Sequence, residues 1–196
     1  IARVSGMSYA DFIQKQIMQP LQMNNSYAAV SMLKNKRNVA SAHSAETGTI
    51  RVIATFEDKI NSACGGIWSN VADLSKWLLV HLNKGKYGSG LNTSLYSEKN
   101  QQEMWQLHTI IKPELTARYN THFYGYGLGW DIEDKKGNLS VSHTGGGAGM
   151  LCKINIIPDL NLGIVVLTNT ENGGRPLFSV ITNTIIDSYL GLDDYD

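Results

Sequence analysis

Four short runs of apolar and β-branched residues follow one another in the second half of the chain, at residues 126–132, 139–143, 150–157 and 162–168. Short polar or glycine-containing connections join them, and one of these is Lys136-Gly137-Asn138. Connections of this length cannot hold the crossover that parallel neighbours need, so neighbouring strands must run antiparallel. The pattern predicts an antiparallel sheet and constrains the fold more than any other feature.

Helical spacing of apolar side chains precedes these strands. It appears in residues 9–17, directly after Ser8, whose hydroxyl predicts an N-cap. A second helix is expected to begin after Asn70 and to end at Gly85, because glycine readily takes the left-handed conformation that terminates helices. Residues 97–108 show a weaker pattern of the same kind.

A last helix is predicted to open at Pro176 and to end near Gly191. The apolar residues expected to face the sheet from this helix are Leu177, Val180, Ile181, Ile185 and Tyr189. Together the elements predict an α/β protein of the α+β kind, in which helices flank an antiparallel sheet.

Composition narrows the possible classes of protein. The chain has 196 residues, of which 42% are hydrophobic and 17% charged, so it can bury a core and is expected to form one domain rather than two. Lysine and arginine together number 17, as do aspartate and glutamate, and no basic run could follow a nucleic-acid backbone. No apolar stretch is long enough to span a bilayer, and the histidines lack metal-ligand spacing. We expect no nucleic acid partner, no membrane span, no metal and no cofactor.

The sequence His143-Thr144-Gly145-Gly146-Gly147 follows the second predicted strand. A strand that ends in this way places a basic ring, a hydroxyl and exposed backbone N–H groups along one edge, which suits an anionic substrate or an oxyanion. Glycine lets a ligand approach the backbone closely because it lacks a Cβ. The alternative is a glycine-rich hairpin connection without a function.

The segments around this motif resemble a known superfamily. The succession YGYGLGW at residues 124–130, then HTGGGAG, then PDLNLGIVVLTN at residues 158–169 resembles the C-terminal part of the serine β-lactamase and penicillin-binding-protein-like superfamily. The similarity is to its class C β-lactamase, DD-peptidase and esterase branch. Upstream, SGMSYADFI with PLQM is similar to the segment after the second catalytic motif of that superfamily, and GGIWS before ADL is similar to its Gly-Gly turn and helix start. The resemblance covers nearly the whole chain and implies a β-lactamase/transpeptidase-like fold.

Two motifs of that superfamily are missing from the sequence. Its nucleophile lies in Ser-x-x-Lys and a second base in Tyr-x-Asn, and only the third motif is found in the expected place. The string from Ser31 to Lys34 fits Ser-x-x-Lys, but it follows the PLQM segment, so we interpret it as a chance match. Residues 1–4 also read as the last turn of a helix that stops at Gly6. We therefore expect residues 1–196 to be the C-terminal portion of a single β-lactamase/transpeptidase-like domain, incomplete at the N-terminus, with its nucleophile upstream of Ile1.

The resemblance implies roles for the third motif. Gly146 would supply one of two backbone N–H groups that hold the oxyanion, and His143 takes the place usually held by lysine, where it would orient an anionic group or relay a proton. Thr144 and Gly145 would contact the substrate. Because imidazole is only partly protonated near neutral pH, carboxylate recognition should be weaker than with lysine. This favours a peptidase, esterase or amidase over an efficient β-lactamase.

Three more residues have structural and functional interpretations. Tyr126 would bind substrate as a wall of the cleft, although a place in the core is equally compatible with the sequence. Trp130 is expected in the core. Asn169 could cap the last strand or face the substrate.

Two functions remain open at this point. The first is a portion of a serine hydrolase that acts on amide or ester bonds of a β-lactam, a D-amino-acid peptide or an ester through an acyl-enzyme. The second is a noncatalytic penicillin-binding-like module that binds peptide or a protein partner. The expected partners are a small-molecule or peptide substrate, and the missing N-terminal portion or a second copy of the chain. The resemblance implies a periplasmic, secreted or cell-envelope location.

Overall fold

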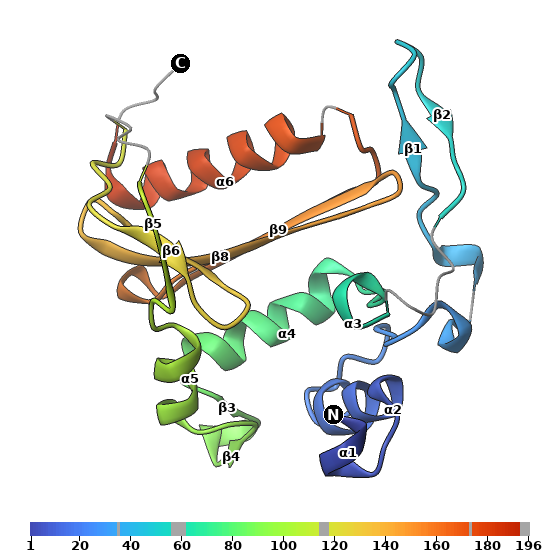
Figure 1. Cartoon of the computed structure of the whole chain (residues 1–196), viewed down its shortest axis with the longest axis horizontal. Helices are drawn as coiled ribbons and strands as arrows, with labels where there is room; N and C mark the ends of the chain where they lie inside the picture. The colour runs from blue at the N-terminus through green and yellow to red at the C-terminus, as the bar shows by residue number, and fades with distance from the viewer. Residues whose placement is uncertain (35, 56–61, 114–117, 173, 193–196) are drawn as a thin grey trace. The chain divides into compact units, whose positions relative to one another are not determined.

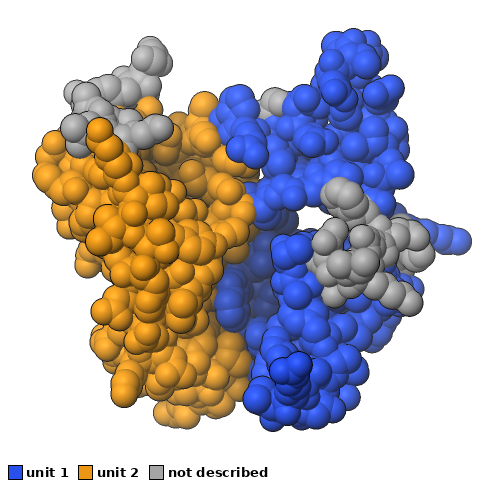
Figure 2. Space-filling model, in the orientation of Figure 1, with its two compact units in different colours: residues 1–77, 145–152, 167–177 blue, residues 78–144, 153–166, 178–196 orange. Residues whose placement is uncertain are grey.

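The computed structural model describes residues 1–34, 36–55, 62–113, 118–172 and 174–192. Their contacts divide the chain into two compact units, shown in Figure 2. Unit 1 comprises residues 1–77, 145–152 and 167–177, and unit 2 comprises residues 78–144, 153–166 and 178–196. The expectation of a single domain stays a prediction.

Most of the helices precede the strands of the main sheet along the chain, and α6 follows them (Figure 1). The helices are α1 (Ala2–Ser5), α2 (Tyr9–Ile13), the π-helical η1 (Gln14–Met18), the short 3-10 helices η2 (Val30–Met32), η3 (Lys36–Asn38), η4 (Ser89–Leu91) and η5 (Pro158–Leu160), α3 (Ser62–Gly65), α4 (Val71–Leu82), α5 (Glu98–Met104) and α6 (Gly174–Leu190). The strands are β1 (His43–Ser44), β2 (Arg51–Val52), β3 (Lys86–Tyr87), β4 (Thr93–Ser94), β5 (Thr109–Ile111), β6 (Tyr124–Tyr126), β7 (Asp131–Lys135), β8 (Asn138–Gly147), β9 (Met150–Ile157) and β10 (Leu162–Thr168).

The predicted helix caps are present. The hydroxyl of Ser8 accepts a backbone hydrogen bond of 3.1 Å at the start of α2, and Oδ1 of Asn70 accepts one of 3.0 Å from Asp73 at the start of α4. Gly6 ends α1 with φ of 68° and Gly85 follows α4 with φ of 87°. These local signals predicted the helix ends correctly.

The main sheet has six strands in the order β10-β9-β8-β7-β6-β5. The order follows the chain, and the pairs from β5 to β8 are antiparallel, which confirms the antiparallel sheet. Lys136 and Gly137 form the two-residue turn between β7 and β8, and both have positive φ, of 51° and 79°. This is the turn chemistry that a tight hairpin requires, because two positive φ values match the twist of the flanking strands.

The strand predicted over residues 126–132 is wrong. β6 ends at Tyr126 and β7 begins at Asp131, and the N–H of Gly127 donates a 2.8 Å hydrogen bond to the carbonyl of Trp130 across the turn between them. Gly129 has φ of 82°, a conformation that breaks a strand. The segment is thus a hairpin connection, and its apolar residues do not form a continuous strand.

The helix predicted over residues 97–108 is too long. The helix α5 ends at Met104, and residues from Thr109 onward pair as β5 with β6. The backbone lies so close here that a Cβ on Gly125 would meet the carbonyl oxygen of Thr109 at 2.3 Å. Pairing with β6 overrides the weak helical pattern, which no local signal could reveal.

The apolar core of unit 2 lies between the sheet and the second half of α4. Its buried residues are Leu78 from the helix and Trp130, Ile132, Val141 and Ile156 from the sheet and its connection. Trp130 is 8% exposed, which confirms the expectation that it belongs to the core. The hydrophobic effect therefore holds α4 on this face, shown in Figure 1.

The opposite face of the sheet, under α6, combines apolar and polar side chains. Gly163 of β10 faces Leu78 of α4, so the buried Leu162 and Ile164 on either side of it lie on the face of α6. Nζ of Lys153 lies 5.8 Å from the ring centre of Phe178 of α6, and burial, with the nearby charge of Lys135, lowers the pKa of Lys153. Nδ2 of Asn155, two residues along the same strand, donates a 3.0 Å hydrogen bond to Oγ of Ser140. Both Asn155 and Ser140 are buried, so polar side chains are enclosed between this face of the sheet and α6.

The face of α6 that turns inward differs from the prediction. The inward residues are Phe178, Thr182 and Ile186, which are 6%, 1% and 0% exposed, whereas Leu177 and Val180 are 49% and 62% exposed. Contacts with the sheet decide which face of α6 turns inward, and the spacing of apolar residues within the helix selected the wrong face.

A buried hydrogen-bonded group joins α4 to α5 in unit 2. The hydroxyl of Tyr96 lies 2.7 Å from Nδ1 of His81 and 3.2 Å from Oε1 of Gln101, whose Nε2 donates to the carbonyl of His81. The His81 ring meets Trp130 edge-on, with 4.9 Å between the ring centres. Burial lowers the pKa of His81 from 6.5 to about 4, so the ring is neutral in the folded protein.

We expect His81 to make stability depend on pH. The pKa is near 6.5 in the unfolded chain and about 4 in the folded one, so between these values the unfolded state binds more protons and the free energy of unfolding falls as the pH falls. The difference corresponds to a loss on the order of 3 kcal/mol. Urea unfolding between about pH 4 and 7.5 measures it, and His81→Gln should remove this component of the slope.

His108 provides a control for this measurement. His108→Gln should leave in place the component of the slope that belongs to His81, because the His81 ring contacts Tyr96, Trp105 and Trp130 instead. An equal slope in His81→Gln and the wild type would contradict the assignment to His81.

Candidate functional site

The motif His143–Gly147 lies inside β8 and is not the connection between two strands. The turn that follows consists of Ala148 and Gly149, and Gly149 has φ of 67°. The strand predicted over residues 139–143 is therefore too short, and the interpretation of the motif as a hairpin connection is wrong. Glycine weakens a strand in isolation, but pairing with β9 keeps these residues in the extended conformation of a strand.

β8 extends past the end of β7. The paired residues of the two strands run from Lys135 opposite Asn138 to Asp131 opposite Ser142. From His143 onward, no strand in the described part of the chain lies on this side of β8. The motif thus presents a free strand edge.

The register determines which backbone groups face this free edge. Lys135 and Asn138 flank a two-residue turn, so they form a hydrogen-bonded pair, and such pairs recur at every second residue. Ser142 therefore turns its N–H and C=O toward β7. By the same alternation, the backbone groups of Thr144 and Gly146 point to the free edge. This direction is the one that an oxyanion donor at Gly146 would need.

The side chains of the motif alternate between the faces of the sheet. His143 follows Val141 on the face of the apolar core, and Thr144 points to the face of α6. Both residues are exposed. Because the edge between the two faces is open, both side chains could reach a group that lies along it, and a shared contact with substrate stays a prediction.

The ring of His143 has a partner. Its Nε2 lies 2.9 Å from the hydroxyl of Tyr126, with 6.1 Å between the ring centres and 59° between the planes. The structure thus brings together two of the predicted site residues. Their contact makes Tyr126 a neighbour of His143 rather than a part of the apolar core.

Gly145 is required by packing in unit 1. A Cβ at this position would lie 2.5 Å from Sγ of Cys152, whereas one at Gly146 would lie 3.2 Å from Cδ2 of Leu151. Cys152 is half-buried, and burial raises the pKa of its thiol. The hydrogen bond from the Gly145 backbone has the opposite but smaller effect on this pKa. The thiol therefore fills the space that a side chain on β8 would need.

His43 and Asn169 lie beside the β8–β9 turn in unit 1. The N–H of His43 donates to the carbonyl of Gly149 (3.3 Å), and its Nδ1 lies 3.0 Å from the carbonyl of Asn169. Nδ2 of Asn169 donates to the carbonyl of Ser41 at 3.1 Å and lies 3.3 Å from Nδ1 of His43, so this side chain joins the end of β10 to the segment before β1. Sequence reasoning missed His43, because a lone histidine far along the chain gives no local signal.

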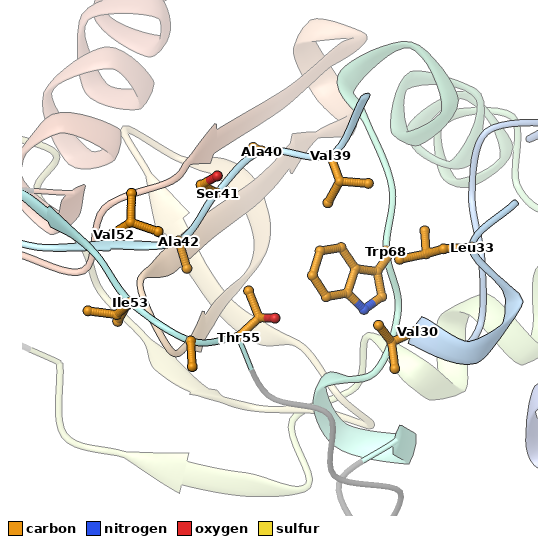
Figure 3. A pocket seen from close by; sticks show the side chains of 11 residues that line it. Val30, Leu33, Val39, Ala40, Ser41, Ala42, Val52, Ile53, Thr55 and Trp68 are labelled. Atoms are coloured by element: carbon orange, nitrogen blue, oxygen red, sulfur yellow. The ribbon is translucent and has the colours of Figure 1, made fainter. Parts of the chain in front are cut away.

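A cavity of about 310 Å³ opens elsewhere in unit 1 (Figure 3). Its lining comes from η2, the base of the β1–β2 hairpin and the indole of Trp68; the residues are Val30, Leu33, Val39, Ala40, Ser41, Ala42, Val52, Ile53, Ala54, Thr55 and Trp68. The lining is apolar except for two hydroxyl side chains and carries no titratable group. It offers apolar surface but no group that could perform acid–base chemistry.

The Ser31–Lys34 pair does not have the geometry of a nucleophile and its base. Ser31 lies in the 3-10 helix η2, which ends at Met32, and Leu33 is already extended with ψ of 111°. The two residues therefore do not share a helical face, although their spacing in the sequence would suggest it.

Within the described residues, no group of three or more histidine, cysteine, aspartate or glutamate side chains could hold a metal ion. None of the helices described here combines the length and apolarity needed to cross a membrane.

Comparison with known proteins identifies the family. The model of the Beta-lactamase family matches residues 1–183. The chain therefore belongs to the Beta-lactamase family, which agrees with its antiparallel sheet and flanking helices.

Relatives with known names are distant. The chain is 24% identical over 175 residues to the D-alanyl-D-alanine-carboxypeptidase/endopeptidase AmpH of Escherichia coli (strain K12), covering 85% of this chain and 41% of that protein. It is 26% identical over 217 residues to the unguisins hydrolase ungD of Aspergillus violaceofuscus, covering 100% of this chain and 37% of the relative. The chain thus spans about two fifths of the length of these relatives.

Solved structures share the fold. The octameric penicillin-binding protein homologue from Pyrococcus abyssi has a TM-score of 0.73 at 26% identity, over 87% of this chain and 35% of that one. A class C β-lactamase from Rhodobacter sphaeroides has a TM-score of 0.65 at 19% identity, over 94% of this chain and 56% of that one. These similarities confirm the β-lactamase/transpeptidase-like fold.

We expect Gly145→Ala to lower the free energy of unfolding by about 1–3 kcal/mol, because the new methyl group would overlap Sγ of Cys152. In a Cys152→Ala background the sulfur is gone, so most of this penalty should disappear. Urea unfolding of the wild type, both single variants and the double variant measures the coupling. Gly146→Ala is the control with a smaller loss, and strict additivity of the two substitutions would refute the contact.

Proposed function

We propose that this chain is a portion of a serine hydrolase that acts on amide or ester bonds through an acyl-enzyme. The free edge of β8 is the observation that carries the proposal, because it directs the backbone of Gly146 outward beside His143. The serine nucleophile and its base would be supplied by the part of the protein that precedes Ile1. The lengths of the relatives support this, since the chain spans only about two fifths of them.

The proposed reaction proceeds in two steps. The serine oxygen attacks the carbonyl carbon while its proton passes to a base, and the carbonyl oxygen becomes an oxyanion. The N–H of Gly146 donates a hydrogen bond to that oxyanion, together with the N–H of the serine. The base gives its proton to the leaving amine or alcohol, which departs. A water molecule then attacks the acyl-enzyme and passes a proton to the base, and the serine oxygen regains a proton as the carboxylic acid product leaves.

The other motif residues would bind and orient the substrate. His143 would orient an anionic group of the substrate or relay a proton, Thr144 would add a hydroxyl, and the absence of a side chain at Gly145 lets the substrate lie close to the strand. An imidazole is only partly charged near neutral pH, so it would hold a carboxylate less firmly than lysine does. We therefore favour a D-amino-acid peptide, an amide or an ester as substrate over efficient turnover of a β-lactam.

The relatives support hydrolysis of such bonds. AmpH is named as a D-alanyl-D-alanine carboxypeptidase and endopeptidase, and ungD as an unguisins hydrolase. The proposed partners are a small-molecule or peptide substrate and either the N-terminal portion of the same protein or a second copy of the chain. Exposed apolar side chains on α6, among them Leu177 and Val180, support such a partner. The proposed location is periplasmic, secreted or in the cell envelope.

The chain of residues 1–196 by itself is expected to show no hydrolase turnover, because it contains neither Tyr-x-Asn nor a Ser-x-x-Lys pair on one helix. Incubation with a chromogenic β-lactam and with a p-nitrophenyl ester tests this. Steady turnover that disappears in Ser31→Ala would show that the Ser31–Lys34 pair had been dismissed wrongly.

In the longer protein, His143→Ala should lower kcat/KM by roughly ten- to hundredfold, which corresponds to about 1.5–3 kcal/mol for loss of a charge-assisted contact. His143→Lys should retain or improve the binding of carboxylate-bearing substrates above neutral pH, because lysine stays charged there. Steady-state kinetics on a peptide and on an ester measure both effects.

A melting curve of each variant is the control for folding. Kinetics of His143→Ala equal to those of the wild type would remove His143 from the site. A longer protein that binds a D-amino-acid peptide without any turnover would instead favour the noncatalytic penicillin-binding-like module.

A further inference from the structure

We infer that Tyr126 is a positioning residue that holds the ring of His143 through Nε2, so that Nδ1 is the ring atom presented to the substrate. This inference rests on the proposed function for its meaning in catalysis. The contact itself does not depend on that function. It assigns Tyr126 a role other than binding the substrate directly.

The geometry is that of a hydrogen bond rather than of ring stacking. The phenol oxygen lies 2.9 Å from Nε2, whereas the ring centres are 6.1 Å apart and the planes are inclined by 59°. An oxygen–nitrogen distance of this size is typical of a full hydrogen bond. The hydroxyl of Tyr126 is therefore engaged before any substrate arrives.

Tyr126 is anchored on both sides, whereas His143 is not. β6 pairs with β5 and β7, which places Tyr126 opposite Thr109 and Asp131, and its carbonyl accepts a 3.0 Å hydrogen bond from the N–H of His108. His143 is the first residue of β8 beyond the pairing with β7, and it is exposed. The phenol thus restrains a side chain that has no paired strand on the β7 side.

The glycines on either side of Tyr126 allow its backbone to lie close to neighbouring backbone. A Cβ on Gly125 or on Gly127 would lie 2.3 Å from a backbone carbonyl oxygen, of Thr109 and of Met104 respectively. The backbone on either side of Tyr126 therefore lies directly on neighbouring backbone. A tyrosine held in this way can fix the direction of a hydrogen bond.

We assign the donor role in this hydrogen bond to the phenol, because a phenol O–H is a stronger acid than the N–H of a neutral imidazole, and this assignment fixes the tautomer of His143. A neutral imidazole has one nitrogen that donates and one that accepts. When the phenol O–H donates to Nε2, the ring proton resides on Nδ1, and Nδ1–H becomes the donor that faces the site. When the ring gains a second proton, Nε2–H donates to the phenol oxygen, so the contact persists in both charge states.

Histidine-selective ¹⁵N labelling of the longer protein tests the inference without a measurement of turnover. At a pH where the ring is neutral, the two-bond ¹⁵N–¹H spectrum should show His143 as the Nδ1–H tautomer. Tyr126→Phe, which removes only the hydroxyl, should shift His143 toward the Nε2–H tautomer. An Nε2–H tautomer in the wild type, or a spectrum that Tyr126→Phe leaves unchanged, would overturn the inference.

Tyr124 offers a matched control in the same strand. Tyr124 lies two residues before Tyr126, and its hydroxyl donates a 2.8 Å hydrogen bond to Oδ1 of Asp131. Tyr124→Phe removes the same atom and should leave the tautomer of His143 as in the wild type. A change in His143 equal to that of Tyr126→Phe would mean a general effect on β6, and it would also overturn the inference.

Kinetics of the longer protein separate positioning from substrate binding. Tyr126→Phe should lower kcat by roughly three- to tenfold, the usual effect of one lost neutral hydrogen bond, with KM for an uncharged ester unchanged. A rise in KM with unchanged kcat would instead assign Tyr126 to substrate binding. If His143→Ala has no kinetic effect while the tautomer result holds, the proposed function fails and the positioning contact stands.

Discussion

The pairing of β7 with β8 is the constraint on which the rest of the site depends. The two-residue turn at Lys136 and Gly137 aligns the strands, and the pairing ends at Ser142. A slip of one residue would exchange the two faces of β8, and the backbone of Gly146 would then point toward β9. The same register keeps Val141 in the apolar core and leaves His143 at a free edge, so core packing and site geometry have one common cause.

The two faces of the sheet in unit 2 differ in composition. The face toward α4 is apolar and is held by the hydrophobic effect, whereas the face toward α6 buries polar groups beside apolar side chains such as Ile164 and Ile186. On that face Nζ of Lys135 lies 2.8 Å from a carboxylate oxygen of Glu133, and Arg118 pairs with the buried Asp187 of α6. A buried carboxylate needs such a partner, because an unpaired charge is costly away from water.

Close backbone approach explains why glycines surround the candidate site. Gly145 makes room for the thiol of Cys152, and Gly125 makes room for the carbonyl of Thr109. Gly145 thereby lets β8 lie close to β9, and Gly125 lets β6 lie close to β5. Membership in the Beta-lactamase family supports the proposal that the free edge of β8 contributes to a hydrolase site.

Local signals in the sequence predicted the caps at Ser8 and Asn70 and the strands β9 and β10, because each depends on residues within a few positions. Only the tertiary structure decided that α6 turns Thr182 inward, that β8 runs on to Gly147, and that Tyr126 holds His143. The physical reason is that these three features arise from contacts between distant segments: the packing of α6 on the sheet, a partner strand and a hydrogen bond between two strands. Spacing along one segment carries no information about such partners.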